Sequence, residues 1–148
     1  MNDPLAKKTD PEIEHMNKHY TMFWNEVTQT YNAILPEIWK MLNTKEHIPL
    51  NHLLLLLYGI AEGEVIDPAL NEIIEGKILK SLKNITKYEN KDLIYGIQGL
   101  ANSLLSNETK KKVYKTLSKQ INRIKVEDLN LDLKLRLAWG ISVLEEFD

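Results

Sequence analysis

The sequence predicts an all-α fold, with six helices arranged as three stacked helical hairpins in a short solenoid or a compact helical array. Apolar residues recur at intervals of three and four along most of the chain, which is the period of an amphipathic helix. Residues 50–62 include five consecutive leucines and leave no polar helix face, so other helices should surround this segment. Apolar and charged residues alternate only at 131–137, and the residues that follow continue in a helical period.

Residues that favour helix ends divide the chain into its expected elements. Asp10–Pro11 and Asp67–Pro68 each place an N-cap acid before a proline that suits the first helical turn. Pro36 lies inside the first expected helix and predicts a kink or a restart, because proline lacks the backbone N–H group. The helices are expected at 11–43, 50–62, 68–84, 90–105, 108–124 and 131–146.

Length and composition narrow the class of protein. The 148 residues suit one domain, and we expect a flexible N-terminal arm at 1–11 followed by a single helical-repeat domain at 12–148. The absence of cysteine excludes disulfides and thiolate metal sites. A net charge of −2 lacks the basic surplus of nucleic-acid binders, and no apolar run is long enough to cross a membrane. Without a secretory signal, we expect a cytoplasmic protein with no cofactor and with neither nucleic acid nor membrane as its partner.

A short segment recurs in the second helix of each expected hairpin, at Leu57–Ala61, Ile97–Ala101 and Ala138–Ser142. The third residues of these segments, 40 and 41 residues apart, are Gly59, Gly99 and Gly140. Glycine inside a helix costs about 1 kcal/mol relative to alanine, so its recurrence suggests that a neighbouring backbone approaches closely there. The period and the hairpin layout resemble those of HEAT-type αα-repeat proteins, which implies stacked hairpins.

The segment Gly96–Ala101 also resembles the glycine-rich inner helices of lanthionine-cyclase-like α/α toroids. Those enzymes bind zinc through cysteine and histidine ligands, whereas this chain has no cysteine and is too short to close a toroid. The second resemblance therefore implies close helix packing and no cyclase chemistry.

Aromatic residues are concentrated on the first expected helix, and tyrosine and tryptophan are enriched at the hot spots of protein interfaces. These side chains either fill the core of the first repeat or form a docking surface for another protein. A ridge formed by the second helices of the hairpins is the alternative surface. The candidate partner-binding residues are Tyr20, Trp24, Tyr31 and Trp39.

Basic residues cluster on the helix expected at 108–124, where they form either an ordinary solvated face or a site for phosphate or an acidic partner. This face supports an RNA-binding helical repeat as an alternative function. It begins at Lys110 and continues through Lys111, Lys112, Lys115, Lys119 and Arg123.

His15 and His19 are four residues apart on the first helix, a spacing at which two imidazoles can hold one metal ion, and Glu12 precedes them. No second cluster supplies further ligands or a general base, so we predict two solvated histidines and no metal site. A small metal-dependent enzyme remains an alternative.

The sequence carries no nucleophile-elbow, phosphate-binding or paired-carboxylate motif. We therefore predict that the protein is not an enzyme but a non-catalytic protein–protein interaction module: a scaffold, an adaptor or an assembly subunit. Its partner would be another protein, in an oligomer or a larger complex. An inhibitor or immunity-type protein that binds one partner is an alternative that the sequence does not distinguish.

Overall fold

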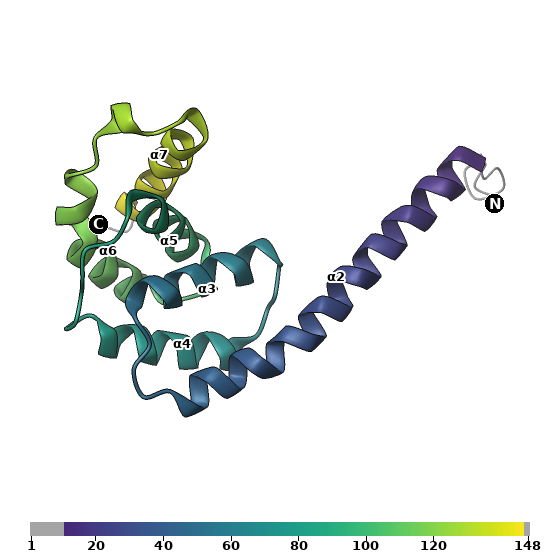
Figure 1. Ribbon diagram of the computed structural model, residues 1–148, viewed down its shortest axis with the longest axis horizontal. Helices are drawn as coiled ribbons and strands as arrows, with labels where there is room; N and C mark the ends of the chain where they lie inside the picture. The colour runs from purple at the N-terminus through teal and green to yellow at the C-terminus, as the bar shows by residue number, and fades with distance from the viewer. Residues whose placement is uncertain (1–10, 147–148) are drawn as a thin grey trace. The chain divides into compact units, whose positions relative to one another are not determined.

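The computed structural model describes residues 11–146, and this part of the chain is helical without any strand (Figure 1). The all-α prediction is therefore confirmed, and the helices lie within a few residues of their expected bounds. Most of the predicted arm and the expected N-cap at Asp10 lie outside the described residues. The elements are α2 (Pro11–Thr44), α3 (Leu50–Glu62), α4 (Pro68–Ser81), α5 (Asn90–Asn102), α6 (Asn107–Asn122), the 3-10 helix η1 (Val126–Asp128) and α7 (Leu131–Glu145).

The chain divides into two units, one that ends at Thr44 and one that begins at Lys45. We expected a single domain at 12–148, and the division falls between the first two predicted helices. The described part of the first unit is α2, a helix of 34 residues that includes Pro36. We expected a kink or a restart at this proline, and the helix continues through it without a restart, because the missing N–H group removes only one hydrogen bond of a long helix.

In the second unit, α5 packs against α3 on one side and against α7 on the other (Figure 1). The helix α4 packs against α3, and α6 packs against α5 and α7. The leucine-rich α3 contributes the fully buried Leu53, Leu54 and Leu57 to the core. However, Leu55 and Leu56 are only half-buried, so the expectation that α3 is surrounded on all sides is wrong.

Side-chain caps fix where α4, α6 and α7 begin, and the cap of α6 is the Ser106 hydroxyl, which accepts a hydrogen bond from the backbone N–H of Thr109 at 3.3 Å. The Asp67 side chain accepts a hydrogen bond from the backbone N–H of Leu70 at 3.1 Å, as the Asp67–Pro68 pair predicts. The Asn130 side chain accepts one from the backbone N–H of Leu133 at 2.8 Å. Each cap satisfies an N–H group that has no partner inside its own helix, and together they set the starts of α4, α6 and α7.

The backbones of α3 and α5 come close together at Gly99. A Cβ atom added to Gly99 would lie 2.6 Å from the carbonyl oxygen of Leu54 and 2.6 Å from the backbone nitrogen of Tyr58. Both atoms belong to the α3 backbone, so a side chain at this position would force the two helices apart. The close approach that we expected is therefore present here.

The other two glycines have different surroundings. A Cβ atom on Gly140 of α7 would lie 2.9 Å from Cγ2 of Ile97 on α5, so this position is also crowded. A Cβ atom on Gly59 of α3 would meet nothing within 4 Å among the residues that the structure describes. The expected close approach is thus wrong at Gly59, because this side of α3 is exposed.

Glu75 of α4 is hydrogen-bonded to the start of α6. Its Oε1 atom accepts a hydrogen bond from the Ser106 hydroxyl at 2.7 Å and another from the Thr109 hydroxyl. The Thr109 bond first, and the Ser106 bond second, stabilise the carboxylate and hold the pKa of Glu75 below its ordinary value of 4.5. This contact joins two helices that are separated by α5 in the chain.

Gly99→Ala should lower the free energy of unfolding by about 1–3 kcal/mol, because the new methyl group would overlap backbone atoms of α3. Gly59→Ala and Gly76→Ala should raise it by up to about 1 kcal/mol, since both positions are helical with open space and alanine favours the helix. Urea unfolding followed by circular dichroism measures all three changes. A Gly99→Ala protein that is more stable than the wild type would contradict the close approach.

Glu75→Gln should lower the free energy of unfolding at pH 7 by about 1 kcal/mol. This value is small for charge-assisted hydrogen bonds because the Glu75 carboxylate is partly exposed. Because the folded-state pKa is lowered, this stabilisation is present above the unfolded value of 4.5 and is lost as the pH falls through the folded value. Urea unfolding at pH 7 and at about pH 3 should show the difference shrinking. The exposed Glu72→Gln serves as the control, and an equal effect of Glu75→Gln at both pH values would refute the assignment.

Candidate functional site

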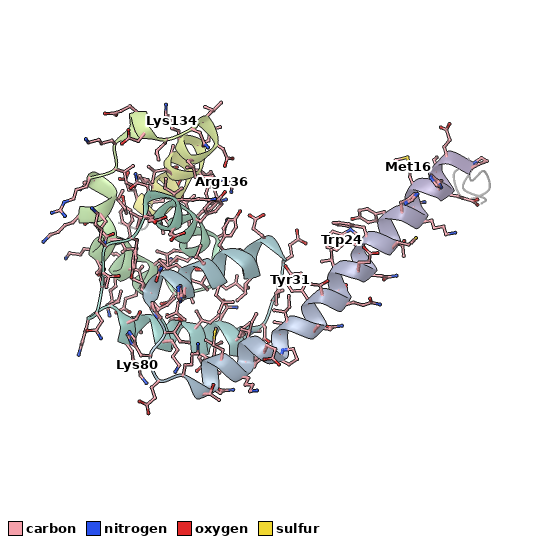
Figure 2. The ribbon with its side chains drawn as sticks, viewed as in Figure 1. Met16, Trp24, Tyr31, Lys80, Lys134 and Arg136 are labelled. Carbon is pink, nitrogen blue, oxygen red and sulfur yellow. The ribbon has the colours of Figure 1, made fainter. Side chains whose placement is uncertain are left out.

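The N-terminal part of α2, as far as Trp24, exposes its large apolar side chains. Tyr20 is 65% exposed, Phe23 58% and Trp24 39%. The Trp24 ring centroid lies 5.9 Å from that of Tyr20 and 5.9 Å from that of Phe23, in edge-to-face geometry. Figure 2 shows Met16 and Trp24 along this helix. We name as the α2 apolar surface the exposed residues Ile13, Met16, Tyr20, Phe23 and Trp24.

The four predicted partner-binding residues divide into two groups. Tyr20 and Trp24 are exposed and belong to the α2 apolar surface. Tyr31 and Trp39, nearer the C-terminus of the helix, are half-buried. A role of all four in partner binding stays a prediction, and the N-terminal pair is the more accessible.

A second surface lies on the ridge of α3, α5 and α7, where Arg136 of α7 contacts side chains of the other two helices (Figure 2). Arg136 Nη1 donates to the Tyr58 hydroxyl at 3.1 Å and to Gln98 Oε1 at 2.9 Å. The guanidinium carbon lies 5.0 Å from the ring centroid of Tyr95. The Nε atom donates to Asp132 at 2.9 Å, which raises the pKa of Arg136. These five residues form the Arg136 cluster.

The sequence predicts this ridge as a possible binding surface, but it does not indicate which side chains form the Arg136 cluster. Arg136 and Tyr58 are 78 residues apart in the chain, so no local spacing brings them together. The donors of Arg136 face the other members of the cluster, and its side chain is 28% exposed. The cluster therefore links three helices and offers a polar and aromatic patch rather than an open charge.

The basic face of α6 is smaller than we expected. Lys110 is buried, its Nζ lies 3.4 Å from the carbonyl oxygen of Ala101, and burial lowers the pKa of its amine. Lys110 precedes Val113 by three residues and Leu117 by seven, so the helical period already places it on the inward side. Including Lys110 in the exposed face was therefore wrong. The other predicted members are exposed, namely Lys111, Lys112, Lys115, Lys119 and Arg123.

Part of the positive charge on α6 is compensated within the helix. Lys112 Nζ lies 3.2 Å from a carboxylate oxygen of Glu108, one turn earlier. A pair of this kind, four residues apart on an exposed helix, contributes about 0.3–0.5 kcal/mol. It also reduces the field that a phosphate backbone would meet at this end of α6.

The two histidines of α2 contact each other. His15 Nε2 and His19 Nε2 are 3.0 Å apart, close enough for one ring to donate to the other. Within residues 11–146, no group of three or more histidine, aspartate or glutamate side chains is arranged to hold a metal ion. Glu12 therefore does not complete a three-ligand site with the two histidines.

No helix within residues 11–146 combines the length and the apolar character that a membrane span requires. Comparison of the chain with protein-family models, with curated proteins and with solved structures finds no match. The exposed side chains and the contacts between helices therefore indicate two candidate sites, the α2 apolar surface and the ridge that carries the Arg136 cluster.

Arg136→Lys and Arg136→Ala should both lower the midpoint of urea unfolding by similar amounts. A lysine ammonium group cannot bond to Tyr58 and Gln98 together while it stacks on a tyrosine ring, so the conservative change should not preserve the cluster. Lys134→Ala, at an exposed position two residues earlier on α7, is the control and should leave the midpoint unchanged. A wild-type midpoint for Arg136→Lys would show that the planar group is not needed.

Proposed function

We propose that this protein is not an enzyme and acts by binding another protein through the α2 apolar surface. The observation that carries the proposal is the exposure of Tyr20, Phe23 and Trp24 on one stretch of helix. Contiguous exposed apolar patches are uncommon on proteins that act alone, and they mark interaction surfaces. Tyrosine and tryptophan give such a surface a large contact area at a small cost in side-chain entropy.

The geometry of α2 favours a helical or groove-shaped partner. Ile13, Met16, Tyr20 and Phe23 follow one another at spacings of three and four, so they share one face of the helix. A helix of 34 residues is about 50 Å long, which gives a partner several turns of this face to contact. Helix-in-groove binding and helix–helix pairing both use side chains at this spacing.

The proposal includes the HEAT-like hairpin repeat as its architecture. The close helix approaches at Gly99 and Gly140 support it, since a repeat would place equivalent glycines at equivalent helix contacts. In this arrangement the repeats make up the second unit, and α2 carries the binding surface. Whether the protein is a scaffold, an adaptor, an assembly subunit or an inhibitor then depends on its partner.

A protein partner is favoured over RNA by the state of the α6 lysines. Lys110 is buried and Lys112 is paired with Glu108, so the basic face presents less free charge than the sequence indicates. The affinity of proteins for nucleic acids depends strongly on the number of basic side chains that contact phosphates. Lys115, Lys119 and Arg123 remain exposed for such contacts.

The triple variant Tyr20→Ser, Phe23→Ser and Trp24→Ser tests the α2 apolar surface. Affinity capture from an extract of the source cells, with quantitative mass spectrometry, should show at least a tenfold loss of the specific partner, because hot-spot truncations cost about 2 kcal/mol or more each. The free energy of unfolding should change by no more than about 0.5 kcal/mol per substitution, since the side chains are exposed.

The matched control replaces three exposed polar residues on the opposite side of α2, Lys18, Asn25 and Gln29, with serine. This control should retain the partner that the first triple variant loses. Equal retention of every partner by both triple variants would reject α2 as the binding surface.

A further inference from the structure

The junctions of α5 with α3 and with α7 share one register. A Cβ atom on Gly99 would lie 2.6 Å from the backbone nitrogen of Tyr58. A Cβ atom on Gly140 would lie 3.7 Å from the backbone nitrogen of Gln98, beside the Ile97 side chain. Tyr58 and Gln98 are 40 residues apart, and the two glycines are 41 residues apart. Each glycine thus faces a corresponding position on the helix that precedes its own in the row α3, α5, α7.

Side-chain contacts follow the same register. The rings of Tyr58 on α3 and Tyr95 on α5 lie 5.0 Å apart between centroids. Gln98 on α5 accepts the hydrogen bond of Arg136 on α7 at 2.9 Å. Tyr95 and Arg136 are 41 residues apart, so both junctions pair the same two positions, although the chemistry of the pairs differs.

The side of α5 that packs against α3 has an equivalent on α3 itself, and on α3 this side is open at Gly59. Gly59 lies 40 residues before Gly99, and a Cβ atom on it would meet nothing within 4 Å in the described part of the chain. Leu55 and Leu56, one turn earlier on the helix, are half-buried. On this side of α3, Leu55 and Leu56 lie beside a notch at Gly59 where another backbone could come close, and the exposed His52 and Glu62 lie on the same helix face.

The side of α5 that packs against α7 has an equivalent on α7 itself, and on α7 this side is exposed. Trp139 lies 41 residues after Gln98 and is 43% exposed. Leu135 lies 41 residues after Ile94, and it is 62% exposed whereas Ile94 is fully buried. A terminal helix in a stack ordinarily carries a polar outer face, because no neighbour covers it. Here the outer face of α7 carries a leucine and a tryptophan instead.

We propose that a second copy of this chain docks head to tail, so that α3 of one copy packs against α7 of the other in the register of the α3–α5 and α5–α7 junctions. Gly59 of one copy would then face the α7 backbone at Trp139 of the next. The occupant is a second copy because one chain carries both halves of the junction, the notch and the apolar ridge. The interface is heterologous and leads to an open chain of copies or a closed ring.

The register specifies the side-chain contacts of this interface. Trp139 takes the place of Tyr58 and Gln98, and it contacts Leu55 of the second copy, which takes the place of Tyr95. The position of Gly96, where a Cβ atom would lie 3.1 Å from Leu54 Cβ, corresponds to the buried Leu137 of α7, so the α5–α7 junction has room for a leucine there. In the α3 helix this position is Leu56, and its contact in the second copy would be Leu135. The interface uses no residue of the α2 apolar surface, so it goes beyond the proposed function and stands or falls separately.

Gly59→Ala separates the stability of the single chain from its self-association. The substitution should raise the free energy of unfolding at low concentration and weaken self-association at least tenfold, because Gly99 shows that the junction has no room for a Cβ atom. Gly76→Ala, also at an open helical position, should raise stability and leave self-association unchanged. Sedimentation velocity of the full chain up to about 1 mM measures self-association, and circular dichroism measures stability.

Trp139→Glu tests the other half of the interface, with Leu79→Glu on α4 as the control at an exposed apolar position. Trp139→Glu should abolish self-association, and Leu79→Glu should not. Each of Gly59→Arg and Trp139→Glu alone should be monomeric. An equimolar mixture of the two should form dimers that do not grow further, because each variant retains the half that the other lacks.

Three results would overturn the proposal: a wild-type chain that stays monomeric at about 1 mM, loss of association with Trp139→Glu but not with Gly59→Arg, or no dimer in the mixture. The second result would mean that α7 pairs with itself in a symmetric interface. Retained self-association of the Tyr20, Phe23 and Trp24 triple variant would show that the two surfaces act independently.

Discussion

The contact between the α5 backbone at Gly99 and the α3 backbone at Leu54 and Tyr58 determines how the second unit packs. Two helices can approach this closely only where one of them has no side chain, so the glycine determines the distance between their axes. The α5 helix is thereby held between α3 and α7, and its residues Ile94 and Ile97 are fully buried. A central helix that is covered on both sides gives the unit a single apolar core.

Polar contacts complete this packing at the rim of the unit. Arg136 joins α3, α5 and α7 through Tyr58 and Gln98, and Glu75 joins α4 to the first turn of α6. Charge-assisted hydrogen bonds at partly exposed positions add little stability individually, but they require specific geometry. They therefore favour one relative arrangement of helices that hydrophobic burial alone would leave less specific.

Two groups of exposed apolar residues lie on α2 and α7, the first and the last helix of the described chain. The α2 apolar surface is presented on a helix that belongs to its own unit, and the exposed Leu135 and Trp139 lie on the last helix of the row α3, α5, α7. A helix at the end of a stack ordinarily carries a polar outer face, whereas α7 carries the apolar Leu135 and Trp139 there. We propose the α2 apolar surface for a different protein and the exposed sides of α3 and α7 for another copy of the chain.

Most features that the sequence pattern predicts correctly depend on local interactions. The all-α class, the helix bounds and the Asp67 cap depend on contacts between residues three or four positions apart, which a sequence pattern contains. The surroundings of each glycine and the contacts of Arg136 depend instead on how the helices pack in the tertiary structure. Gly59 and Gly99 occupy similar local sequences, yet only Gly99 meets another backbone. Likewise, the pairing of Arg136 with Tyr58 spans 78 residues, so it depends on which helices become neighbours, and packing across the whole unit determines those neighbours.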